Sequence, residues 1–154
     1  MLLGFPAEEE GVVDLVVFGH EAPLAAGPGG VRRLPHAGGL PLGLAELTSG
    51  DPPPVLRAAV APEETLLLVT DGVTEARDGA GAFYPLADDI AAGLAREPRT
   101  AEPDRLVAYV RDGTLRHCGG RLDDDTTIFA VRRRGAGSTR GDGGGRGGQG
   151  VRDM

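Results

Sequence analysis

The chain has 154 residues, enough for one domain with a hydrophobic core, and a formal net charge of −7 at pH 7. Residues 1–131 hold 21 acidic residues and 10 arginines, and such an acidic body argues against nucleic acid as a partner, because phosphate neutralisation needs clustered cations. The single cysteine, Cys118, excludes an internal disulfide and fits a reducing compartment, so we expect a cytoplasmic protein. No apolar stretch approaches the ~18 residues of a membrane span, so we expect no membrane partner.

The first half of the chain predicts a sheet. Runs rich in β-branched and apolar residues, separated by glycine and proline turns, indicate two hairpins and then two further strands. The segments, in chain order, are residues 2–5, 12–18, 23–26, 31–34, 55–60 and 65–70. The last of these has no polar alternation and is expected to be buried on both faces. Residues 38–44 and 48–54 are expected to form a long irregular connection.

The second half predicts two helices and a strand. Leu86, Ile90 and Leu94 form an amphipathic stripe that ends before Pro98. Pro103 suits a first helical position, and Gly119-Gly120 would end that second helix. Residues 126–131 predict a final strand, so that the whole is an α+β domain, and residues 135–154 predict a disordered tail rich in glycine and arginine.

Two acidic segments follow or precede apolar strands. Asp71 comes at the end of the run 65–70 and is followed by Gly72, which permits the close approach of another backbone segment. Asp124 lies 53 residues further on, within Asp123-Asp124-Asp125 before the final strand. We expect the two carboxylates to converge on a site for a hard divalent cation, which favours oxygen ligands.

Each of these features has a simpler interpretation. Asp71-Gly72 is also typical of a strand-ending turn, and the three aspartates taken alone of a solvated acidic turn. His20 is more typical of a histidine bonded to nearby backbone, His117 of a helix C-terminus, and Cys118 of an inert, partly buried thiol. A further histidine, His36, lies in a predicted loop. Glu75 and Arg77 could reach a substrate, or lie in a solvated turn.

Four segments together resemble the C-terminal portion of a PPM-type metal-dependent serine/threonine phosphatase domain, of the bacterial SpoIIE/RsbU kind. They are residues 19–24, 40–44, 66–78 (LLLVTDGVTEARD) and 119–132 (GGRLDDDTTIFAVR). The resemblance implies a partial phosphatase domain over residues 1–134, folded as a truncated four-layer α-β-β-α sandwich with antiparallel sheets and a two-metal site between them.

Carried over to this chain, the resemblance makes Asp71 and Asp124 the metal ligands through which catalysis acts, with Gly72 and Asp125 as supporting residues beside them. It implies two Mn²⁺ or Mg²⁺ ions and hydrolysis of phosphoserine or phosphothreonine in a signalling protein, such as an anti-sigma-factor antagonist. Two ions of this kind stabilise the attacking and the leaving oxygen.

The family's earlier Asp-rich segment, which supplies further ligands, has no counterpart in this sequence. We therefore expect the chain to be inactive alone, as a truncated gene model or a degenerate remnant. Two other interpretations stay open: a non-catalytic regulatory module of pseudophosphatase type, and a product without a stable fold.

Overall fold

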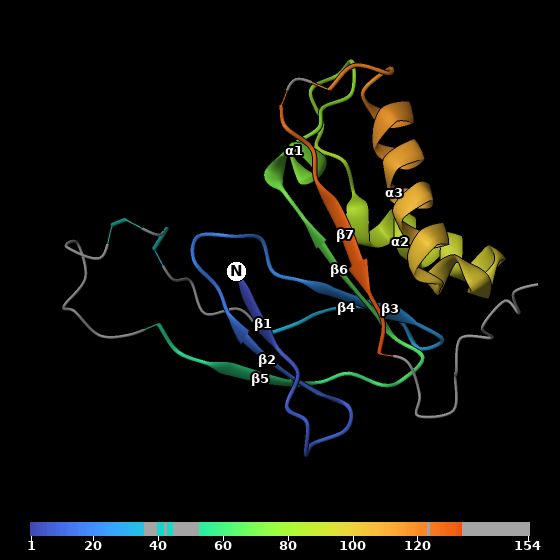
Figure 1. Ribbon diagram of the computed structural model, residues 1–154. Coiled ribbons are helices and arrows are strands. Elements are labelled where there is room, and N and C mark those ends of the chain that lie inside the picture. Colours follow the sequence, from blue (N-terminus) through green and yellow to red (C-terminus); the bar gives the residue numbers. More distant parts are fainter. Residues whose placement is uncertain (36–39, 42, 45–52, 123, 134–154) are drawn as a thin grey trace, which may run out of the picture.

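The computed structural model in Figure 1 describes residues 1–35, 40–41, 43–44, 53–122 and 124–133. The strands are β1 (Leu2–Gly4), β2 (Val12–Val16), β3 (Leu24–Gly27), β4 (Gly30–Arg33), β5 (Leu56–Ala59), β6 (Thr65–Val69) and β7 (Ile128–Val131). The helices are α1 (Asp71–Thr74), α2 (Leu86–Arg96), the 3-10 helix η2 (Pro98–Ala101) and α3 (Pro103–His117).

The strands form two antiparallel sheets. The first has the order β1-β2-β5 and the second the order β4-β3-β6-β7. Both predicted hairpins are confirmed, since β1 pairs with β2 and β3 with β4. In the second sheet, Leu67 of β6 lies opposite Leu24 on one side and Ala130 on the other. The pairing brings β6 and β7, which are far apart in sequence, side by side (Figure 1).

β6 lies at the centre of the molecule, as its unbroken apolar run predicts. Its residue Leu67 packs into a core beneath the helices, whereas Leu66 packs into a second core between the two sheets. Both side chains are 1% exposed. A strand with a helix layer on one face and a sheet on the other needs apolar residues on both faces.

The helices cover the outer face of the second sheet (Figure 1). The predicted stripe of α2 is buried at Leu86, Ile90 and Leu94 within the helix-side core. The end of α3 is also as predicted, because Gly119 and Gly120 have φ of 66° and 86°, in the left-handed region that glycine tolerates. Of the four expected layers, the described residues thus form three: one sheet, the second sheet and one helix layer.

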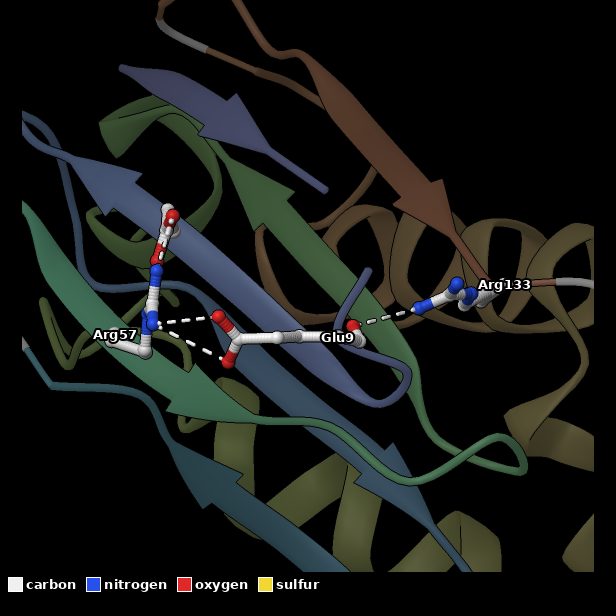
Figure 2. A network of polar contacts seen from close by, with 4 residues as sticks. Glu9, Arg57 and Arg133 are labelled. Atoms are coloured by element: carbon white, nitrogen blue, oxygen red, sulfur yellow. Dashed lines mark hydrogen bonds and ion pairs between the residues drawn. The ribbon is translucent and has the colours of Figure 1, made fainter. Parts of the chain in front are cut away.

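Polar contacts join the two sheets at their edges. Arg32 of β4 donates two hydrogen bonds to the Glu64 carboxylate, at 2.7 and 3.0 Å, and a third to the carbonyl of Ala59 in β5. On the first sheet, Arg57 lies between the carboxylates of Glu9 and Asp14, and Arg133, just after β7, donates to the Glu9 carbonyl (Figure 2). The exposed pairs of this second network stabilise little, because water screens them.

Several sequence expectations differ from the structure or lie outside it. The sequence pattern predicted no helix directly after β6 and none at residues 98–101, where the structure has α1 and η2. Most of the irregular connection 38–54, His36, Asp123 and the tail 135–154 lie outside the described residues. In the described part of the chain, no helix is long and apolar enough to cross a membrane.

Candidate functional site

The segment after β6 is held rigidly by its own backbone and by the core. The Thr70 carbonyl accepts a hydrogen bond from the Val73 amide at 3.0 Å, and the Asp71 carbonyl accepts one from the Glu75 amide at 2.7 Å. The Val73 side chain is fully buried in the helix-side core. Asp71 is therefore fixed in position although its side chain is exposed, with Oδ1 accepting from the Gly72 amide at 3.0 Å.

The segment before β7 lies against this one. The Thr70 hydroxyl donates to the Asp125 carbonyl at 3.1 Å and accepts from the Thr127 amide at 2.9 Å. The Thr70 amide donates to the Thr127 carbonyl at 3.1 Å. Thr70 therefore makes three hydrogen bonds to the backbone of the segment that leads into β7. The two acidic segments thus meet at one end of the second sheet, beside α1 (Figure 1).

Gly72 is the residue that permits this contact. A Cβ atom built at Gly72 would lie 2.6 Å from the Asp125 carbonyl oxygen and 3.1 Å from Thr126 Oγ1. Any other residue would push the segment away, because a carbonyl oxygen belonging to the backbone cannot rotate aside. The close backbone approach that the sequence predicts at Gly72 is therefore present.

Asp124 and Asp125 of the second segment have exposed side chains. Asp124 Oδ1 accepts from the Asp125 amide at 2.7 Å, and both side chains are exposed. Asp124 and Gly72 line one cavity, of about 170 Å³, which we call the α1 cavity. Asp71 is not among its lining residues. The structure therefore brings the Asp71 and Asp124 segments together, with Asp124 facing the cavity and Asp71 on the neighbouring surface.

The carboxylate oxygens of Asp71 and Asp124 are ligands of the type that a hard cation prefers, but they are few. Carboxylate oxygens on exposed strand ends are what Mg²⁺ and Mn²⁺ prefer, and Mg²⁺ commonly binds through one or two carboxylates while keeping several waters. Among the described residues, no group of three or more His, Cys, Asp or Glu side chains could hold a metal ion. Asp71 and Asp124 therefore fit a hydrated, weakly held ion rather than a protein-enclosed one.

The other singled-out residues have structural contacts. The Glu21 amide donates to His20 Nδ1 at 3.1 Å, which agrees with the backbone-bonded interpretation. His117 ends α3, its Nε2 lies 2.9 Å from the Ala82 carbonyl, and its ring lies 5.4 Å from that of Tyr84. Cys118 is half-buried, with Sγ 3.6 Å from the Leu115 carbonyl, and it is one of the residues that line the α1 cavity.

The sequence interpretation missed a small loop that follows α1. Arg77 and Phe83 form an isolated β-bridge, and the Arg77 guanidinium lies 4.2 Å above the centre of the Phe83 ring. Asp78 closes the loop by accepting hydrogen bonds from the amides of Ala82 and Ala80, which hold the pKa of its carboxyl below the ordinary value. Asp78-Gly79 is a common turn dipeptide and was the available signal.

Comparison with solved structures places the fold among PP2C phosphatase domains. The chain is 28% identical to the RsbU and RsbW domains of Rv1364c from Mycobacterium tuberculosis, with a TM-score of 0.62 over 80% of this chain and 33% of that one. For the Mn-presoaked phosphatase domain of SpoIIE from Bacillus subtilis, the identity is 13% and the TM-score 0.63, over 90% and 57% of the two chains. For the SiaA-PP2C domain of Pseudomonas aeruginosa, the values are 22% and 0.55, over 80% and 46%.

The chain thus spans less than two thirds of the length of each of these solved chains. Among curated proteins there is no match. The family model of stage II sporulation protein E matches residues 1–134, which include both sheets, all the helices and the two acidic segments. The chain therefore belongs to the SpoIIE family of PP2C-like phosphatase domains.

Proposed function

We propose that the chain takes part in metal-dependent hydrolysis of phosphoserine or phosphothreonine in a signalling protein, such as an anti-sigma-factor antagonist. Asp71 and Asp124 bind Mn²⁺ or Mg²⁺ in this proposal, and Gly72 and Asp125 support them. The family match and the PP2C-type fold support a phosphatase-type function. The proposal keeps the expectation of a cytoplasmic protein without nucleic-acid or membrane partners, which rests on the acidic body and the single cysteine.

The observation that carries the proposal is the contact between the two acidic segments. Thr70 and Gly72 bring the backbone of residues 125–127 against the start of α1, although the segments are 53 residues apart in sequence. Like charges repel, so a cation between or beside the two carboxylates would stabilise the contact between their segments.

The chain's own groups have definite tasks in this proposal. Asp71 and Asp124 each offer a carboxylate to the ion, and the Thr70 hydroxyl fixes the distance between their segments. Asp125 leads the second segment toward β7, and its amide orients the Asp124 carboxylate. When bound, a divalent ion would activate water and stabilise negative charge on the phosphoryl oxygens.

A non-catalytic regulatory module is the alternative, and a specific observation favours it. The described residues offer no group of three or more potential ligands, so an ion held through Asp71 and Asp124 alone would be bound weakly. Under this alternative the chain keeps the surface of the fold as a binding module and has no hydrolytic activity by itself, as the sequence analysis expects.

The two functions are separated by measuring metal binding and hydrolysis on the same samples. Mn²⁺ binding is followed by the loss of the free-ion electron paramagnetic resonance signal, and hydrolysis by phosphate release from a phosphoserine peptide. The proposal expects Asp71→Asn and Asp124→Asn to lower Mn²⁺ affinity at least 10-fold, with Asp112→Asn at an exposed position of α3 as the matched control. Metal binding without phosphate release supports the regulatory alternative, and equal affinity in all four proteins refutes both assignments of ligands.

A further inference from the structure

Two arginines line the α1 cavity next to the proposed metal ligand Asp124. Arg77 lines it from the segment after α1, and Arg121 from the loop after α3, while Gly72 and Asp124 form the side nearest the acidic segments. A volume of about 170 Å³ exceeds the roughly 10–15 Å³ that one water needs. The cavity is therefore large enough to take a chemical group of a ligand.

The Arg77 side chain is held in place before any ligand arrives. Its guanidinium lies 4.2 Å from the centre of the Phe83 ring, and its Nη1 donates to the Gly81 carbonyl at 3.0 Å. Stacking uses the face of the guanidinium and the Gly81 bond uses one of its five N–H groups. The remaining N–H donors keep their orientation, so a bound oxyanion has less side-chain entropy to overcome.

Among the described residues that line the cavity, the formal charges balance without an ion. Arg77 and Arg121 supply two positive charges, and Glu75 and Asp124 supply two negative charges. A divalent cation at Asp124 would make the sum positive, because bound ions are the largest local charges in such sites. Anion binding in the cavity is therefore expected to be coupled to metal binding, in a chain whose body is otherwise acidic.

We propose that the α1 cavity is an oxyanion subsite in which Arg77 binds a phosphate or carboxylate group of the substrate protein. Arginine forks match both groups with paired, charge-assisted hydrogen bonds. The subsite rests on the proposed function, because it takes its ligand from the phosphoprotein that the metal site would act on. Arg77 recognises the substrate in this proposal, and Phe83 is a positioning residue that keeps the guanidinium oriented.

The test measures binding of a fluorescein-labelled peptide by anisotropy, on the full chain, in Mn²⁺ and again in EDTA. The peptide carries one phosphoserine and one neighbouring glutamate. Arg77→Met, which keeps an unbranched side chain but removes the guanidinium, is expected to weaken binding roughly 5- to 10-fold in Mn²⁺. The control is Arg111→Met, on another exposed arginine, which lies on α3 and whose described partner is Asp112; this variant should bind as the unchanged chain does.

Two further arms identify the group that Arg77 binds. A peptide with glutamate but no phosphate, and one with phosphoserine but no glutamate, show whether the effect of Arg77→Met follows the carboxylate or the phosphate. Inorganic phosphate should compete with the peptide only if the effect of Arg77→Met follows the phosphate. Phe83→Leu should weaken binding at least 3-fold while the arginine charge stays, and the melting temperatures of all variants should agree within the error of the control.

The subsite is refuted if the peptide fails to bind the unchanged chain, or if Arg77→Met binds as tightly as Arg111→Met in both buffers. Either result is distinct from a failure of the proposed function. That failure appears as no Mn²⁺ binding by the unchanged chain, or as Mn²⁺ binding that Asp71→Asn and Asp124→Asn leave unaltered. An Arg77-dependent affinity that persists in EDTA would keep the subsite and remove its coupling to the metal.

Discussion

Replacing Gly72 with alanine directly tests the contact between the two acidic segments. The added Cβ would lie 2.6 Å from the Asp125 carbonyl oxygen, whereas ordinary contacts begin near 3.4 Å, so the segment must move by up to about 0.8 Å. Such overpacking of a buried position costs roughly 1–3 kcal/mol. The gain from replacing glycine in a helix is at most about 1 kcal/mol, and α1 has only four residues.

The net expectation for Gly72→Ala is a loss of about 0.5–2 kcal/mol in the free energy of unfolding. For a chain of this size, that loss corresponds to roughly 2–6 °C in melting temperature. Thermal unfolding followed by circular dichroism measures it, with Gly79→Ala as the control. An alanine Cβ at Gly79 has no heavy atom within 4 Å, so the same chemical change there should be neutral or slightly stabilising.

A second measurement locates the effect. The Thr127 amide donates to the Thr70 hydroxyl, and displacement of the segment by Gly72→Ala should speed hydrogen exchange at this amide more than at amides of α2. If Gly72→Ala melts at or above the temperature of Gly79→Ala and the Thr127 amide keeps its protection, the two segments do not depend on close approach at Gly72. The metal-site proposal would then lose its structural basis.

Three other outcomes are expected. The Arg32 hydrogen bonds hold the pKa of the Glu64 carboxyl below its ordinary value, so their stabilisation is fully present at neutral pH and is lost as the pH falls through that lowered pKa. Glu64→Gln should therefore lower the melting temperature more at pH 7 than at pH 2, and an equal difference at both would contradict this. A Cβ at Gly113 would overlap the Tyr84 hydroxyl, so Gly113→Ala should lower the free energy of unfolding by roughly 1–3 kcal/mol. Urea unfolding measures this loss, and an unchanged midpoint would show that the Tyr84 ring can move aside at no cost. Mn²⁺ should raise the free energy of unfolding by mass action, by about 2.7 kcal/mol at 100 times its dissociation constant, and so raise the melting temperature. An excess of EDTA should reverse the rise, and no shift at millimolar Mn²⁺ would contradict the metal-site proposal.

Local patterns in the sequence determined most of the secondary structure. The hairpin around residues 27–30, the buried β6 and the stripe of Leu86, Ile90 and Leu94 in α2 follow from turn chemistry and hydrophobic period, which act over a few residues. The same short-range rules missed α1, because a single helical turn has no period to detect. They placed the strand β7 two residues early, as strand ends depend on their partner.

Only the tertiary structure decided which segments meet. The sequence indicated that Asp71 and Asp124 belong to strand ends, but the meeting of their segments depends on the pairing of β6 with β7 and on the hydrogen bonds of Thr70. The stacking of Arg77 on Phe83 likewise depends on the path of the loop. Contacts between distant segments depend on register and on closure of the whole chain, for which a local pattern carries no signal.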